Sequence, residues 1–194
     1  VSSTSGASGV YNNNPNEFLE TYGRLYNWRA VADDRGVCPA GWHVPSDDEW
    51  KSLEMELGMS QAHADIQSGV NGNYRGANEN VGAKLAGELS LWLSGDLINN
   101  SEFSLTGFNA PPGGRRNNWS GNYAQKSIQF LVWTSTYLGS GSAWSRGIDR
   151  ENAGTLRFNA DIDFGYAIRC MQDEVTTGFQ SQTKDELQTA VDMR

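Results

Sequence analysis

The residues best equipped for chemistry gather at positions 38–50, where the chain reads CPAGWHVPSDDEW. One of the two cysteines, one of the two histidines and three consecutive acidic residues lie here, so the stretch could be an active site or a metal site. The spacing favours a helix start instead, because Ser46 and Glu49 are three residues apart, as in a capping box. Asp47 and Asp48 then fall in the first turn, where the helix dipole favours acidic side chains. Three consecutive helical residues also point in different directions, which argues against one shared metal ion.

The rest of the chain carries no recognisable catalytic pattern. The two histidines are too few for a histidine metal site, and we expect His43 to be packed or hydrogen-bonded and His63 to be solvated. Serine-hydrolase, zinc-protease, phosphate-loop and EF-hand motifs are absent from the sequence. Among the scattered acidic pairs, Asp161 and Asp163 would share one strand face and are the best candidates for calcium ligands. We therefore expect a protein that is not an enzyme and that needs no cofactor. Calcium is the one possible cofactor that should be tested.

Aromatic and arginine side chains recur between residues 115 and 158, interleaved with Asn, Ser and Gly. Aromatic rings stack on sugars and arginines pair with carboxylates, so this composition is typical of a binding surface built on loops. The alternative is that the aromatic residues fill the core, which we expect for Trp133. Trp119, Tyr123 and Tyr137 are flanked by Gly, Ser and Asn, and we expect them to be exposed. The candidate ligand-binding residues are Arg115, Arg116, Trp119, Tyr123, Tyr137, Trp144, Arg146, Arg150 and Arg157.

Length and charge exclude several classes of protein. A chain of 194 residues can bury one sizeable core, and its 22 glycines and 7 tryptophans suggest a loop-rich fold with aromatic residues inside. A net charge of −8 argues against a general nucleic-acid binder. Residues 113–169 nevertheless carry 7 basic and 4 acidic side chains, which makes them the segment that could attract an anionic partner. No apolar run is long enough to insert directly into a membrane.

Hydrophobic periodicity predicts helices first and strands later, an α+β fold. Trp50, Leu53 and Leu57 would form one apolar stripe on a helix that begins after Ser46 and stops at Gly58. Strands are predicted at 129–136, 143–149, 155–160 and 165–170. We interpret residues 1–16 as a flexible arm or linker, 17–173 as one domain, and 174–194, with a helix signature from Thr183, as a tail or the start of a following module.

Several stretches resemble one bacterial family. YGRLYNWRAV, CPAGWHVPSDDEWKSLE, GFNAPPGGRR, VWTST, AWSR and GYAIRC occur in the order found in the Fibrobacter succinogenes major paralogous domain family, over roughly residues 20–172. That family is similar to the formylglycine-generating-enzyme branch of the C-type-lectin-like fold, which implies short helices packed on a small twisted antiparallel sheet with long Gly/Asn-rich loops. The resemblance also implies an extracellular or bacterial cell-surface protein. The tail FQSQTKDELQTAVDM resembles the opening of BspA-like surface-protein repeats.

The two cysteines, Cys38 and Cys170, could by spacing alone be two free thiols or one long-range disulfide. In the C-type-lectin-like fold a disulfide commonly ties the first helix region to the last strand, so the resemblance implies that they are bonded. Formylglycine-generating enzymes work through reactive cysteines in the C-terminal half, where this chain has only Cys170, so that activity is not expected. The calcium motifs with which C-type lectins bind sugars are also absent.

The expected function is a non-catalytic extracellular or cell-surface module for binding and adhesion. It would present residues 115–158 to a glycan or to another surface protein, and nucleic acid is not an expected partner. The alternative is a structural subunit of an extracellular fibre or of a multidomain surface protein, which would associate with its own copies.

Overall fold

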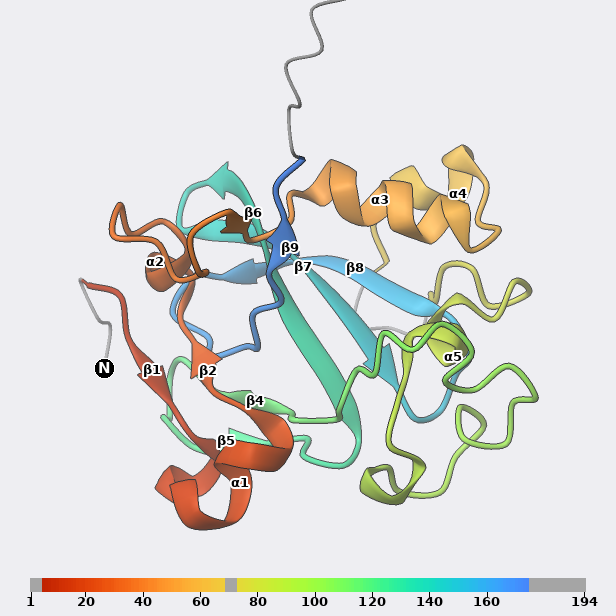
Figure 1. The fold of residues 1–194 in the computed structure, drawn as a ribbon, viewed down its shortest axis with the longest axis horizontal. Helices are drawn as coiled ribbons and strands as arrows, with labels where there is room; N and C mark the ends of the chain where they lie inside the picture. Colours follow the sequence, from red (N-terminus) through yellow and green to blue (C-terminus); the bar gives the residue numbers. More distant parts are fainter. Residues whose placement is uncertain (1–4, 69–72, 175–194) are drawn as a thin grey trace, which may run out of the picture.

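A three-stranded antiparallel sheet forms the centre of the fold (Figure 1). The structure, a computed structural model, describes residues 5–68 and 73–174. β6 (Gln129–Gly139) pairs with β7 (Ser142–Asp149), and β7 pairs with β8 (Thr155–Asp161). These strands confirm the predictions at 129–136, 143–149 and 155–160. Together with the surrounding helices they confirm an α+β architecture.

The strand predicted at 165–170 is wrong. Residues 165–167 make single bridges to three separate segments, at Arg116, Tyr26 and Val132, and therefore form no continuous ladder. The alternating apolar residues of this stretch bury Tyr166 against the sheet instead of extending it. The helix predicted from Thr183 lies outside the described residues.

Short helices and two-stranded pairs surround the sheet. β1 pairs with β2, β3 with β9 and β4 with β5, all antiparallel. No helix in the described part of the chain has both the length and the apolar character needed to cross a membrane. The remaining elements are β1 (Ser8–Gly9), η1 (Tyr11–Asn13), α1 (Pro15–Tyr22), β2 (Leu25–Tyr26), α2 (Trp28–Val31), β3 (Trp42–His43), α3 (Asp47–Glu56), α4 (Gln61–Asp65), α5 (Val81–Leu85), η2 (Leu89–Leu91), β4 (Arg115–Arg116), β5 (Tyr123–Ala124) and β9 (Met171–Gln172).

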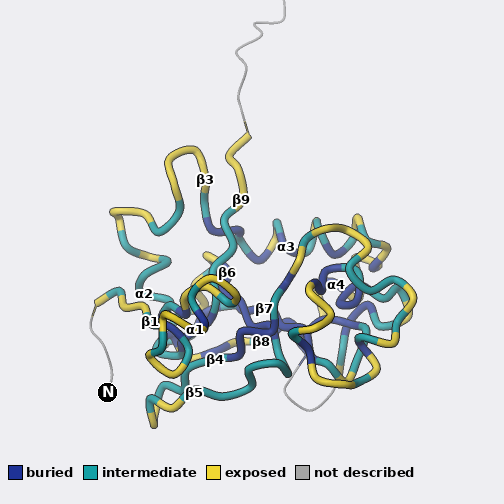
Figure 2. Tube along the Cα trace, turned by 60° about the horizontal axis from the view of Figure 1, so that its bottom comes forward, coloured by how far each residue is buried: buried dark blue, intermediate teal, exposed yellow. Residues whose placement is uncertain are grey.

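The central sheet has a core on each face, because successive side chains of a strand point to opposite sides. Phe130 and Val132 of β6 belong to the core under α3 and α5. Leu131 and Trp133, their neighbours on the same strand, pack on the other face with Tyr166. Figure 2 shows β7 and β8 as buried segments at the centre of the trace, with the exposed loops around them. A side chain on this sheet therefore reaches one of two separate environments.

The helix predicted after Ser46 is confirmed as α3. Ser46 Oγ accepts a hydrogen bond from the backbone N–H of Glu49, and the Glu49 carboxylate accepts one from the backbone N–H of Ser46 at 2.7 Å. This reciprocal pair is a capping box. Trp50 on the apolar stripe is buried, and Gly58 follows the helix with a φ of 111°, a conformation that glycine adopts readily. The acidic cluster thus begins a helix, as its spacing predicted.

The N-terminal segment differs from the flexible arm predicted for residues 1–16. β1 pairs with β2, Val10 is 5% exposed, and α1 already begins at Pro15. A single buried valine and a short backbone pairing anchor the chain here, although its Ser, Gly and Asn content suggested that it had little to bury. The described residues from position 5 onwards therefore form part of the folded body.

β9, close to the last of the described residues, pairs with β3. Cys38 and Cys170 form a disulfide with a Cα–Cα distance of 5.8 Å, as the family resemblance implied. Next to it, His43 Nδ1 lies 2.6 Å from an Asp173 carboxylate oxygen and His43 Nε2 lies 3.0 Å from one of Glu49. Asp173 and Glu49 raise the pKa of His43, and the histidine is hydrogen-bonded, as predicted. His63 is exposed, also as predicted.

Candidate ligand-binding site

The nine predicted ligand-binding residues lie in several separate places. Some line two hollows of the surface, some lie on the outside of the sheet, and two are buried in its core. The larger hollow is lined by Arg115 and Trp119, and the smaller one is lined by Arg116 and Tyr123. The outside of the sheet carries Tyr137 on β6, Trp144 on β7 and Arg150 just after β7. The two buried residues are Arg146 and Arg157.

The larger hollow, which we call the aromatic groove, lies on the face of the sheet that points away from α3. Its volume is about 460 Å³. Its floor is made by β6 and β8, whose alternate side chains point to this face. Ligand sites in proteins commonly have this size and combine apolar walls with a few polar groups. The lining residues are Tyr74, Arg115, Trp119, Gln125, Gln129, Leu131, Asp149, Leu156, Phe158, Asn159, Ala160, Asp161, Phe164 and Tyr166.

A continuous series of aromatic rings leads from the groove into the core. Trp119 is 70% exposed, and its ring meets the edge of Phe164 at a centroid distance of 5.5 Å. Phe164 stacks on Tyr166 at 5.5 Å, and Tyr166 lies 4.6 Å from the fully buried Trp133. Such ring pairs add specific attraction to the area that they bury. The exposed indole is thus supported from behind by a fixed stack.

The loop that carries Trp119 is held by its own hydrogen bonds. It connects β4 to β5, and Asn117 N donates to Asn122 O while Gly121 N donates to Asn117 O. Arg115 Nε donates to the side-chain oxygen of Asn117 at 3.0 Å. These bonds close the loop and reduce the conformational freedom that a ligand would otherwise have to remove.

Polar groups line the groove beside the aromatic rings. Gln129 Nε2 donates to an Asp149 carboxylate oxygen at 2.6 Å, which fixes both side chains. Gln129 Oε1 is buried and finds no hydrogen-bond partner among the residues that the structure describes. Burial and the Asp149 carboxylate raise the pKa of Tyr74 to about 12, so its hydroxyl stays protonated and can donate. The groove thus offers both donors and acceptors to a neutral polar ligand.

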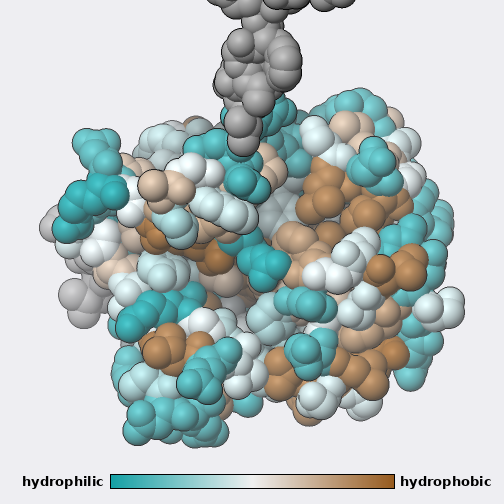
Figure 3. All heavy atoms as spheres, viewed as in Figure 1, coloured by the Kyte–Doolittle hydropathy of each residue, from teal (hydrophilic) through white to brown (hydrophobic). Residues whose placement is uncertain are grey.

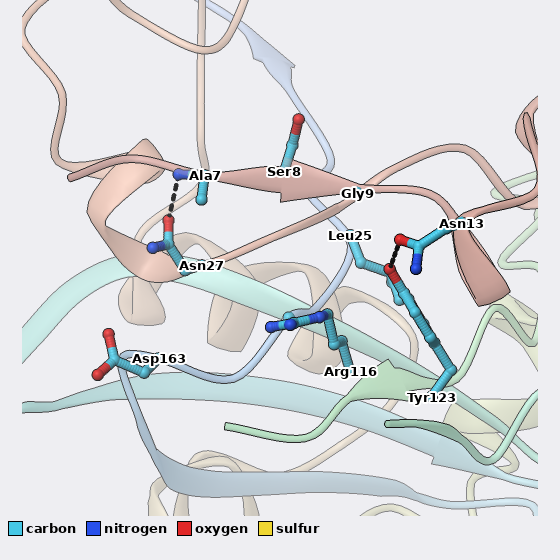
Figure 4. Close-up of a pocket in the computed structure, with 10 residues that line it drawn as sticks. Ala7, Ser8, Gly9, Asn13, Leu25, Asn27, Arg116, Tyr123 and Asp163 are labelled. Carbon is cyan, nitrogen blue, oxygen red and sulfur yellow. Dashed lines mark hydrogen bonds between the residues drawn. The ribbon is translucent and has the colours of Figure 1, made fainter. Parts of the chain in front are cut away.

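The smaller hollow, which we call the Arg116 pocket, lies on the other side of the β4 strand and has a volume of about 320 Å³. Its walls come from β1, β2, β5 and the turn after β8 (Figure 4). Tyr123 Oη donates to Asn13 Oδ1 at 2.8 Å at one end of the pocket. Arg115 and Arg116 are adjacent on β4 and therefore point into different hollows.

Arg146 and Arg157 cannot form part of an exposed surface, which corrects the sequence prediction for these two residues. They are 2% and 6% exposed. They lie directly opposite each other on β7 and β8 and point to the α3 face, where Arg146 Nη1 and Arg157 Nη2 each lie 2.7 Å from the Asp47 carboxylate. An arginine with this environment pairs with buried acids and is inaccessible to a ligand.

The buried ion pairs extend beyond Asp47 to a second acid of α3. The Glu54 carboxylate is bonded by Arg146 Nε at 3.0 Å and by two nitrogens of Arg75 at 2.7 and 2.9 Å. Burial by itself raises the pKa of Asp47, but the lowering by Arg157 and Arg146 is larger. The pKa of Asp47 is therefore held at about 2. We call Asp47, Glu54, Arg75, Arg146 and Arg157 the buried ion cluster. Its position shows that it holds α3 on the sheet.

The other three predicted residues lie on the outside, away from both hollows. Tyr137 is 49% exposed and stacks on Trp28 at 5.0 Å. Trp144 is half-buried beneath the Arg157 guanidinium, 3.6 Å from the ring centroid. Arg150 pairs with Glu151, its neighbour in sequence. Of the three, Tyr137 keeps a free aromatic surface.

Asp161 and Asp163 are not brought together around a shared cation site. Asp161 Oδ1 accepts a hydrogen bond from the backbone N–H of Asp163, which forms a tight turn after β8. The Asp161 side chain lines the aromatic groove, whereas Asp163 lines the Arg116 pocket and pairs with Arg29. Residues 5–68 and 73–174 contain no group of three His, Cys, Asp or Glu side chains placed to hold a metal ion. Calcium binding stays an untested prediction.

Several residues of the groove were not among the predicted set. Phe158, Phe164 and Tyr166 form most of its aromatic wall, and Tyr74 and Asp149 contribute to its polar part. The sequence FNADIDFGY does place three aromatic residues within nine positions, which could have drawn attention to this segment. Nothing in the sequence indicated that it faces the Trp119 loop.

A family model described as the Fibrobacter succinogenes major domain matches residues 2–172. No curated protein and no solved structure gives a significant match. The matched region ends at the last residue of β9, so it includes the central sheet, the aromatic groove and the Arg116 pocket.

Proposed function

The chain belongs to the Fibrobacter succinogenes major domain family, and on this basis we propose that it is a non-catalytic binding module that holds a glycan in the aromatic groove. The observation that carries the proposal is Trp119. Its indole is 70% exposed and stands at a groove whose other walls carry amide, carboxylate and hydroxyl groups. Tryptophan is among the residues enriched at the energetic centres of binding sites, and this one stands at the edge of a groove.

The chemistry of the groove fits a sugar better than other ligands. A pyranose ring has apolar C–H faces that stack on an indole, and hydroxyls that both donate and accept hydrogen bonds. The carboxylates of Asp149 and Asp161 can accept from such hydroxyls, and the Tyr74 hydroxyl can donate to one. The carboxylates of Asp149 and Asp161 would repel a nucleic-acid phosphate.

Replacing Trp119 with Ala is expected to weaken glycan binding by roughly 30-fold, or about 2 kcal/mol, because a central aromatic anchor is removed. A glycan array would identify the ligand, and calorimetry would measure the affinity of both proteins. Trp42→Ala is the matched control, since Trp42 is 44% exposed on β3 and does not line the groove.

Equal glycan affinity of wild type and Trp119→Ala would contradict the assignment of the groove. Addition of EDTA is expected to leave binding unchanged, because we propose that the module acts without a cofactor. If EDTA abolished glycan binding and added calcium restored it, Asp161 and Asp163 would again be candidate calcium ligands.

We also propose that the domain has the C-type-lectin-like fold and works outside the cell or on its surface. The bond between Cys38 and Cys170 supports the location, because disulfides persist in oxidising compartments. The pairing of β3 with β9, which places the last strand beside the segment that leads into α3, supports the fold. Fractionation of the native host and an experimental structure would test the two statements separately.

A second candidate function is a structural subunit that packs against its own copies. Leu89, Leu93 and Leu105 are 55%, 49% and 65% exposed in the segment between α5 and β4. Figure 3 shows apolar residues over the half of the molecule that holds α3 and this segment. Exposed apolar patches often mark protein–protein contacts.

If the chain is a structural subunit, the full chain should be an oligomer in size-exclusion chromatography coupled to light scattering. The double variant Leu89→Ser/Leu105→Ser should be monomeric. Leu138→Ser, at the β6–β7 hairpin, is the matched control and should remain oligomeric. Deletion of residues 1–16 is a poorer test, because it removes β1 and the buried Val10. A monomeric wild type would overturn this second candidate.

A further inference from the structure

The Arg116 pocket holds two opposite charges that do not meet. Figure 4 shows the Arg116 side chain extending through the pocket in the direction of Asp163. The two side chains line the same cavity of about 320 Å³ but form no ion pair with each other. Two flexible side chains of opposite charge in one cavity would normally form an ion pair. Other contacts therefore keep Arg116 and Asp163 apart.

The main chain of Arg116 is held by two hydrogen bonds. Its N–H donates to Gly165 O and its carbonyl accepts from Gly165 N, both at 2.9 Å. A Cβ atom on Gly165 would lie 2.8 Å from the Arg116 Cβ, so only glycine allows β4 and the segment at Gly165 to approach this closely. The guanidinium itself has no hydrogen bond or ion pair within the described part of the chain. Its planar set of donors is therefore free to bind a carboxylate.

Asp163 is held by a different partner. Arg29 Nε donates to Asp163 Oδ1 at 3.3 Å, and the Asp163 side chain is 17% exposed. This contact occupies one carboxylate oxygen, and no hydrogen bond is made by the other oxygen within the described residues. A fixed and partly dehydrated carboxylate with a free oxygen can accept hydrogen bonds from an ammonium group.

We propose that the Arg116 pocket binds a small zwitterion of the α-amino acid class, with the ligand carboxylate on Arg116 and the ligand ammonium on Asp163. A simple anion would be attracted by Arg116 but repelled by Asp163. A simple cation would be attracted by Asp163 but repelled by Arg116. A zwitterion satisfies both groups at once. Asn13 and Tyr123 line the far end and Leu25 one wall, which suits a short side chain.

This inference is independent of the proposed glycan site, because the two hollows share no lining residue. The test is an NMR titration of the isotopically labelled full chain with glycine and L-alanine as probes. Acetate supplies the carboxylate alone and ethylamine the ammonium alone. Glycine and alanine are expected to shift the amide signals of Arg116, Asp163 and Gly165, and to bind at least about tenfold more tightly than either half-probe.

Arg116→Gln is expected to weaken glycine binding at least about tenfold, because a charge-assisted hydrogen bond is lost. Arg115→Gln is the matched control, because it makes the same substitution at the neighbouring residue, which lines the other hollow. This variant should bind glycine as tightly as the wild type does. Asp163→Asn should abolish the preference for glycine over acetate. The amide spectrum of each variant shows whether it is folded.

Three results would overturn the proposal: no glycine or alanine binding by the wild type, acetate binding as tight as that of glycine, or full glycine affinity in a folded Arg116→Gln variant. Trp119→Ala should leave the glycine titration unchanged. Failure of the glycan site and failure of the zwitterion site can therefore be told apart.

Discussion

Replacing Glu54 with Gln is expected to lower the free energy of unfolding by about 3–5 kcal/mol. The Glu54 carboxylate is fully buried and binds the guanidinium groups of both Arg75 and Arg146. Glutamine has nearly the same shape but no charge. The substitution would leave buried positive charge without compensation, and the amide nitrogen would face donors where an acceptor is required.

Glu56→Gln is the matched control for this prediction, because Glu56 is exposed in the same helix. Surface substitutions of this kind usually change stability by less than about 0.5 kcal/mol. Chemical denaturation of both variants and of the wild type gives the comparison. If Glu54→Gln were as stable as Glu56→Gln, the buried ion cluster would have no role in holding α3 on the sheet.

The charge balance of the cluster explains why the acids are the sensitive positions. Three arginines surround two carboxylates, so the cluster carries one positive charge more than it can neutralise internally. Burial lowers the pKa of Arg75, and the nearby guanidinium groups of Arg146 and Arg157 also lower it, although Glu54 raises it. Removing an acid worsens the imbalance.

Part of this cluster could be predicted from the sequence. Trp50, Leu53 and Leu57 define the apolar stripe of α3, and Glu54 lies on the same stripe, four residues after Trp50. A buried acid on a helix requires a buried partner. On β8, Thr155 and Arg157 alternate with Leu156, so the arginine had to point to the face opposite the leucine.

The two hollows could not be predicted in this way. The aromatic groove brings the Trp119 loop to Phe164 and Tyr166, and the Arg116 pocket brings β1 to the turn at Asp163. These contacts depend on how distant segments pack, and local periodicity carries no information about that packing. The capping box and three central strands were predictable because their signals lie within a few residues.

The disulfide was predicted for a different reason. Spacing left Cys38 and Cys170 open to two interpretations, and the resemblance to a family decided between them. The bond joins residues 132 positions apart and encloses the chain from before β3 to just before β9, while residues 5–37 lie outside this loop. Beside the disulfide, two residue pairs of β3 and β9 and the His43–Asp173 contact also join these two segments, close to the surface.

Loss of the Cys38–Cys170 bond is expected to lower the free energy of unfolding by about 5 kcal/mol, because a loop of this length restricts the unfolded chain strongly in the chain-entropy model. Reductant should shift the denaturation midpoint of the wild type to that of the double variant Cys38→Ala/Cys170→Ala. The variant itself should not respond to reductant, since the sequence has no other cysteine. A wild-type curve that reductant leaves unchanged, although both thiols become free to alkylate, would contradict the prediction. A large loss would mean that the domain reaches full stability only in an oxidising compartment, which is where the proposed surface function requires it.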